Sequence, residues 1–118
     1  MDTQMKRGLT EACVLALLSG GDSYGYQLSR QASGLMPLSE STLYPVLRRL
    51  EESGAVETYS SEHGGRLRHY YRITEKGREQ MSGFAREWEQ LGRIYELIRQ
   101  TEKPTQGKDK GGNENETR

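Results

Sequence analysis

Leu38 to Glu57 read LSESTLYPVLRRLEESGAVE, and the apolar residues of this stretch are spaced for one face of a helix. They recur at intervals of three, one and three residues: Leu43, Val46, Leu47 and Leu50. Because an α-helix turns once in about 3.6 residues, these side chains must face a core together. Ser39 is a preferred N-cap, and Gly54 is typical of a helix end. The stretch therefore predicts an amphipathic helix that begins near Glu40.

The opposite face of this helix carries polar side chains. Ser41, Arg48 and Glu52 point away from the core, with Tyr44 and Arg49 at the margins. Pro45 lies past the first turn and should loosen or kink the helix, because proline has no N–H to donate.

Two shorter helices are expected before this one. An apolar run from Leu9 to Leu18 predicts a buried helix in which Cys13 packs as a small hydrophobic residue. A second helix is expected from Tyr24 to Ala32, with Ser23 as its N-cap. Gly25 lowers helix propensity there, which indicates close packing at that position.

Two strands and a long helix are expected after it. Val56–Ser60 and Tyr70–Ile73 are rich in β-branched and aromatic residues, and Gly64-Gly65 between them marks a hairpin tip. Thr74 is a suitable cap for a helix from Glu75 to Thr101. The predicted fold is mainly α with a small β-hairpin, in the order of a winged helix-turn-helix followed by a long C-terminal helix.

Composition and charge narrow the possible functions. The 118 residues carry 17 Lys plus Arg and 17 Asp plus Glu, so the formal net charge is zero and gives no support for nucleic-acid binding. The hairpin is basic, however, since His63 to Arg72 contains three arginines, two histidines and no acid. Arg66 and Arg68 could there contact DNA phosphates or the minor groove. The alternative is a solvated hairpin with incidental arginines.

Several function classes find no support in the residues. His63 and His69 have no cysteines or carboxylates beside them at metal-binding spacing. One buried cysteine and two hairpin histidines cannot together supply a nucleophile, a base and an orienting group. We therefore expect no metal, no cofactor and no enzyme activity. The longest apolar run is far shorter than the ~20 residues of a membrane span, so a cytoplasmic protein is expected.

Three segments together carry a specific resemblance. They are the stretch from Leu38 to Glu57, GGRLRHYYRITEKGRE at Gly64 to Glu79, and YGYQL at Tyr24 to Leu28. The chain resembles the PadR family of transcriptional regulators over about 60% of its length. The resemblance implies a winged helix that binds operator DNA as a homodimer. The single helix after the hairpin is similar to the smaller PadR subfamily.

The expected DNA contacts lie on the third helix and the hairpin, or wing. In a helix-turn-helix the second helix of the pair enters the major groove by its N-terminal residues. The candidate DNA-binding residues are Ser39, Ser41, Thr42, Tyr44, Arg48, Arg49, Arg66 and Arg68. The expected organisation is a DNA-binding domain at residues 1–74, a dimerisation helix at 75–102 and a disordered tail at 103–118.

The last helix has an apolar seam. Its residues are spaced three and four apart, as in a heptad repeat: Met81, Phe84, Trp88, Leu91, Tyr95 and Ile98. We expect this seam to pair with a second copy of the chain. By resemblance to small drug-binding members of the family, Trp88 could stack on a planar aromatic molecule; the alternative is that it only packs in the seam.

The sequence thus predicts a repressor that binds palindromic operator DNA as a homodimer and is released by planar aromatic ligands. Two alternatives stay open. A winged-helix protein-interaction module would not need the basic wing, and a ligand-binding protein would use the dimer seam without binding DNA.

Overall fold

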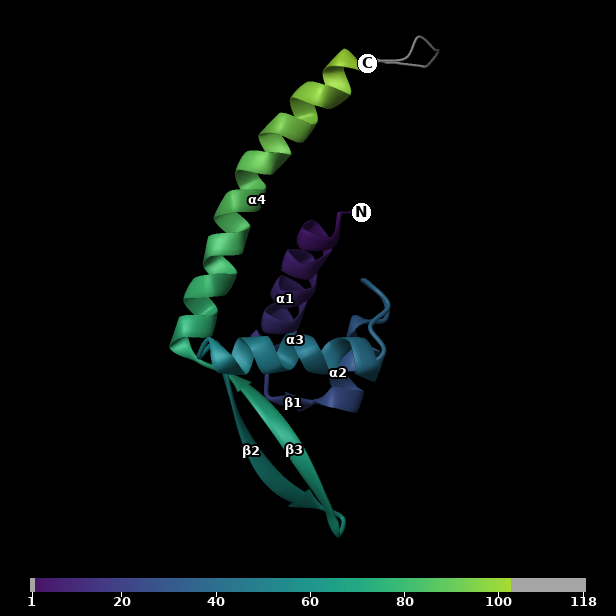
Figure 1. Ribbon diagram of the computed structural model, residues 1–118, viewed down its shortest axis with the longest axis vertical. Coiled ribbons are helices and arrows are strands. Elements are labelled where there is room, and N and C mark those ends of the chain that lie inside the picture. Colours follow the sequence, from purple (N-terminus) through teal and green to yellow (C-terminus); the bar gives the residue numbers. More distant parts are fainter. Residues whose placement is uncertain (1, 103–118) are drawn as a thin grey trace. The chain divides into compact units, whose positions relative to one another are not determined.

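The computed structural model describes residues 2–102, so the tail expected at 103–118 lies outside the described residues. The elements follow in the order α1 (Thr3–Ser19), β1 (Ser23–Tyr24), α2 (Gly25–Ala32), α3 (Glu40–Glu52), β2 (Val56–His63), β3 (Arg66–Ile73) and α4 (Glu75–Thr101) (Figure 1). This arrangement confirms the predicted mainly helical fold with a small antiparallel sheet.

The core lies among α1, α2, α3 and the base of the sheet. The four apolar residues of α3 that face one side are all buried, as the spacing predicts. They pack with Leu15 and Leu18 of α1, Leu28 of α2, and Tyr71 and Ile73 of β3. Cys13 is half-buried against this cluster, and burial raises the pKa of its thiol. Its predicted packing role is confirmed.

The N-termini of the helices are capped differently from one another. Ser39 caps α3 as predicted, since its side chain accepts a hydrogen bond from the Thr42 backbone N–H. The predicted Ser23 cap of α2 is wrong. The Ser23 hydroxyl donates instead to the Gln27 side chain at 2.9 Å, while Tyr24 occupies the cap position without a side-chain hydrogen bond.

Pro45 lies inside α3, and the helix runs on past it to Glu52. Figure 1 draws α3 as one continuous helix alongside α2. The missing N–H of Pro45 therefore does not end the helix, whose buried face holds both of its halves on the core.

The wing is longer than predicted. Its strands pair antiparallel from Val56 opposite Ile73 to His63 opposite Arg66. Gly64 and Gly65 form the two-residue tip with φ of 55° and 79°, which matches the mirror-image turn that such hairpins favour. The hairpin extends away from α1, α2 and α3 in Figure 1.

Strand β1 is an element that the sequence did not predict. It adds Ser23 and Tyr24 to the free edge of β3, opposite Tyr71 and Tyr70. This pairing ties the start of α2 directly to the base of the wing.

The chain divides into two compact units, with the boundary inside α4 between Ala85 and Arg86. In the first unit, the Thr74 hydroxyl donates to the Gly54 carbonyl at 2.6 Å and accepts from the Gly77 N–H at 3.0 Å. Thr74 is therefore the N-cap of α4, as predicted, and it holds the first turn of α4 on the end of α3. None of the helices within residues 2–102 is both long and apolar enough to cross a membrane.

Candidate nucleic-acid interface

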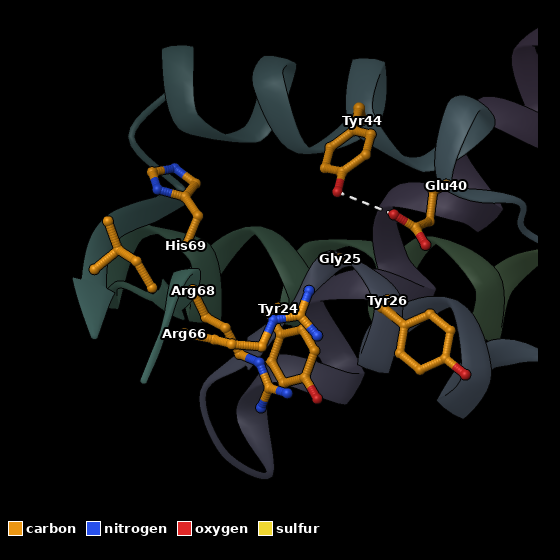
Figure 2. A pocket seen from close by; sticks show the side chains of 9 residues that line it. Tyr24, Gly25, Tyr26, Glu40, Tyr44, Arg66, Arg68 and His69 are labelled. Carbon is orange, nitrogen blue, oxygen red and sulfur yellow. Dashed lines mark hydrogen bonds between the residues drawn. The ribbon is translucent and has the colours of Figure 1, made fainter. Parts of the chain in front are cut away.

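A cavity of about 510 Å³ opens between the start of α2, the start of α3 and the outer half of β3. Its walls combine aromatic, basic and small residues that are far apart in the sequence: Tyr24, Gly25, Tyr26, Glu40, Tyr44, Arg66, Leu67, Arg68 and His69. Figure 2 shows the phenol of Tyr44 and the carboxylate of Glu40 on one side, with the two arginines across from them. The cavity thus brings together one predicted residue of α3 and two of the wing.

Tyr44 is held against the backbone of α2. A Cβ at Gly25 would lie 2.6 Å from the Tyr44 hydroxyl oxygen, so only glycine leaves room for this phenol. The hydroxyl donates to Glu40 Oε1 at 3.2 Å. Partial burial, together with the Glu40 carboxylate, raises the pKa of Tyr44 above its ordinary value, which favours the protonated phenol that donates this hydrogen bond. The close packing predicted at Gly25 is confirmed.

A cluster of hydroxyls marks the start of α3. Ser39 Oγ lies 3.1 Å from Ser41 Oγ and 3.0 Å from Thr42 Oγ1. All three residues are exposed, and each hydroxyl can both donate and accept a hydrogen bond. The first turn of α3 can therefore form hydrogen bonds with either donors or acceptors on a ligand.

The arginines of the wing have different surroundings. Arg72 forms ion pairs with Asp22 at 3.4 Å and Glu57 at 3.7 Å, and it lies over the ring of Tyr59. Its charge is largely compensated inside the chain. No such ion pair within residues 2–102 involves Arg66 or Arg68, and both line the cavity. Of the three wing arginines, Arg66 and Arg68 are thus the two without an acidic partner within the described residues.

Tyr24 orients one of these two side chains. The guanidinium of Arg68 lies over the Tyr24 ring, 4.5 Å from its centroid. The Tyr24 ring also meets the Tyr70 ring edge-on at 5.4 Å, and Tyr70 in turn stacks on Tyr59 at 5.5 Å. An aromatic row thus runs across the base of the wing and supports Arg68.

The two arginines of α3 lie outside the cavity. Arg48 is exposed, whereas Arg49 is partly covered and pairs with Glu11 of α1 at 3.1 Å. Arg49 thereby links α3 to α1.

The sequence did not point to six of the residues that line the cavity: Tyr24, Tyr26, Glu40, His69, Gly25 and Leu67. The YGYQL segment contains the first two, but only the β1 pairing shows that they lie beside the wing. Within residues 2–102, no three His, Cys, Asp or Glu side chains lie close enough together to hold a metal ion.

The seam of α4 falls on both units, which are described separately. In the first unit, Met81 and Phe84 are partly buried against the core of their own chain. In the second, Trp88 is half-buried, while Leu91, Tyr95 and Ile98 are 49%, 60% and 49% exposed. Ile94 and Leu97 beside them are exposed to a similar degree. The second unit therefore presents a broad apolar surface.

Comparison with known proteins identifies the family. The sequence model of the transcriptional regulator PadR-like family matches residues 14–83 of this chain, and these include the walls of the cavity. The chain belongs to the PadR-like family of transcriptional regulators.

Similar proteins extend the match beyond those residues. An uncharacterized protein of Lysinibacillus sphaericus is 34% identical, with 78% of this chain and 89% of that protein covered. A transcriptional regulator from Clostridium thermocellum has a similar structure, with a TM-score of 0.71, 33% identity, and 82% and 96% coverage. A PadR-like transcriptional regulator from Bacillus cereus gives a TM-score of 0.71, 32% identity, and 81% and 96% coverage. The fold is therefore the PadR-like winged helix with a long C-terminal helix.

Proposed function

We propose that this PadR-like regulator is a homodimeric repressor that binds palindromic operator DNA through the start of α3 and through the wing. The observation that carries the proposal is the uncompensated pair Arg66 and Arg68, which lies across the cavity from the first turns of α3. In a winged helix this places basic side chains beside the helix that enters the major groove.

The local charge pattern favours DNA over a protein partner. The chain as a whole is neutral, yet the wing keeps two arginines without an acidic partner and neutralises the third internally. A protein-interaction module would not need this selective arrangement, whereas contact with phosphates requires it.

Recognition of a palindromic operator requires that the second unit pairs with that of another copy of the chain. Leu91, Tyr95 and Ile98 repeat at heptad spacing and are about half exposed, which is unfavourable for apolar side chains in water. A second copy of α4 would cover them. Two-fold symmetry would then present two copies of α3 and of the wing to two equivalent half-sites.

The most detailed part of the proposal is that a planar aromatic molecule releases the repressor from DNA. Trp88 lies on the same heptad line as the exposed seam residues, so a two-fold axis along the seam would bring two indoles towards each other. Two such rings can bracket a flat guest by offset stacking.

Footprinting of the protein on the DNA upstream of its own gene tests the proposal. We expect a protected palindrome, with half-sites about one helical turn apart. A protein that lacks Arg66 and Arg68 should protect nothing at the same concentration. If the intact protein protects no sequence and binds DNA no better than that variant, the proposal is wrong.

A further inference from the structure

Glu40 is the only carboxylate among the residues that line the cavity (Figure 2). It lies in the first turn of α3 and accepts a hydrogen bond from the Tyr44 hydroxyl through Oε1. Within the described residues it forms no ion pair with Arg66, Arg68 or any other base. Oε2 and the remaining lone pairs of the carboxylate are therefore left for a ligand.

A carboxylate at this place constrains what the surface can bind. It accepts hydrogen bonds and cannot donate them, and it repels phosphate oxygens. A surface that only held the DNA backbone would be weakened by such a group. The first turn of α3 is, however, where a helix-turn-helix meets the edges of the bases, and some of those edges offer N–H donors.

We propose that Glu40 reads cytosine in each operator half-site by accepting a hydrogen bond from the cytosine N4 amino group in the major groove. This inference rests on the proposed function, because it requires α3 to enter the groove. It gives the cavity a base-reading wall, Glu40, that is distinct from its phosphate-binding wall, Arg66 and Arg68.

The chemistry of the base edges favours cytosine over the other bases. Guanine presents two acceptors, N7 and O6, and thymine presents an acceptor and a methyl group, so neither suits a carboxylate. Adenine has an amino donor at N6, but the neighbouring N7 acceptor would face the second carboxylate oxygen. Cytosine itself presents only its amino donor to the groove, so one carboxylate oxygen can accept from it without meeting an acceptor on the same base.

Tyr44 acts in this scheme as a positioning residue. Its hydroxyl donates a hydrogen bond to Glu40, and its ring lies against Gly25, so it holds the carboxylate in one orientation. A glutamate at the first turn of a helix would otherwise sample several rotamers in solvent. Tyr44 therefore contributes to base preference through Glu40.

The test is selection of binding sites from a random DNA library with four full-length proteins. These are the wild type, Glu40→Gln, Glu40→Ala and the control Glu52→Gln. Glu52 is an exposed acid at the other end of α3 and does not line the cavity. The control thus removes one negative charge from the same helix away from the proposed contact, and thermal unfolding checks that all four proteins fold.

The wild type and Glu52→Gln should select a cytosine at one position of each half-site. Replacing that cytosine should weaken their binding by about fivefold to 150-fold, the usual cost of one mismatched base pair. Glu40→Gln should prefer adenine at the same position, because a carboxamide can bond adenine N6 and N7 together. Glu40→Ala should accept any base there. A fifth protein, Tyr44→Phe, should show a weaker cytosine preference without a change of the preferred base.

Two results would overturn the inference, and they are distinguishable. If all four proteins select the same sequence with equal stringency, Glu40 reads no base and serves only the helix terminus, while operator binding stands. If the wild type enriches no sequence at all, operator recognition itself is wrong, and the role of Glu40 falls with it.

Discussion

Gly77 of α4 lies directly against the carbonyl oxygen of Ala55, close enough that a Cβ on Gly77 would collide with it. The same Cβ would lie 2.8 Å from Ile73 Cγ1. Both obstacles belong to the wing or its connection to α3, and one of them is backbone. The first turn of α4 is therefore seated on the base of the wing, where a side chain cannot be accommodated without a shift of the main chain.

Gly77→Ala should destabilise the protein by about 1–3 kcal/mol, because overpacking outweighs the gain in helix propensity of about 1 kcal/mol. Gly34→Ala is the matched control: a Cβ there meets nothing within 4 Å, so its effect should stay within about 0.5 kcal/mol. Urea unfolding of both variants measures the difference. Equal stability of the two would mean that α4 is not seated as described.

The three arginines of the wing should differ in how much they contribute to DNA binding. Replacing Arg66 and Arg68 by alanine should weaken binding to all sequences. It should also lower the slope of log affinity against log salt by up to about 3.6 for four lost phosphate contacts in a dimer. Arg72→Ala should leave the slope nearly unchanged, because Asp22 and Glu57 already compensate that charge. Titrations at several salt concentrations would contradict this assignment if Arg72→Ala lowered the slope as much as the double variant.

Tyr24 should act on DNA through Arg68. Tyr24→Leu removes the ring under the guanidinium and should cost about 0.5–1 kcal/mol of binding per subunit, the usual strength of an exposed cation–π contact. Tyr24→Phe keeps the ring and should bind DNA like the wild type. In a protein that already carries Arg68→Ala, the two Tyr24 variants should bind equally. A persistent difference there would show that Tyr24 acts by another route.

The sequence predicted α2, α3 and α4 to within a residue or two because their apolar residues follow the helical period, and because Ser39 and Thr74 cap α3 and α4. It underestimated the length of the wing, since Ser61–His63 and Arg66–His69 are mostly exposed and lack the apolar alternation typical of strands. Backbone pairing and the Gly64-Gly65 turn extend the hairpin there. Strand β1 is too short to show any periodicity.

The cavity was only partly predictable from sequence. Position in the motif pointed to Tyr44, Arg66 and Arg68, but the direction of the Tyr44 side chain depends on the missing side chain of Gly25, nineteen residues earlier in the chain. Glu40 was overlooked because a glutamate in the first turn is an ordinary partner of the helix dipole. Only its place opposite the wing arginines makes it a candidate base reader.

The exposed seam should control assembly. Leu91→Glu together with Ile98→Glu places two charges on half-exposed apolar positions and should make the protein monomeric at micromolar concentration. Gln90→Glu with Gln100→Glu adds the same charge to exposed positions off the seam and should leave the dimer intact. Sedimentation velocity distinguishes the two cases. A wild type that sediments as a monomer would contradict both the seam and two-fold operator recognition.

Trp88 should report on the proposed ligand, because it is the only tryptophan in the chain and its fluorescence comes from one place. Flat aromatic cations or phenols should quench it saturably at micromolar concentration if two indoles bracket them in the dimer. Trp88→Ala should weaken ligand binding, followed by calorimetry, by about 1–3 kcal/mol, since stacking on two rings is lost. Sedimentation should show that this variant is still a dimer.

The ligand can regulate only if it binds the DNA-competent and DNA-free dimers with different affinity. Operator titration with saturating ligand measures this difference, and we expect weaker DNA binding in the wild type and no change in Trp88→Ala. Saturable binding that Trp88→Ala does not weaken would place the ligand elsewhere on the protein. Binding that leaves operator affinity unchanged would make Trp88 part of a ligand site without a switch. No quenching across a panel of such compounds would mean that the indole serves packing alone.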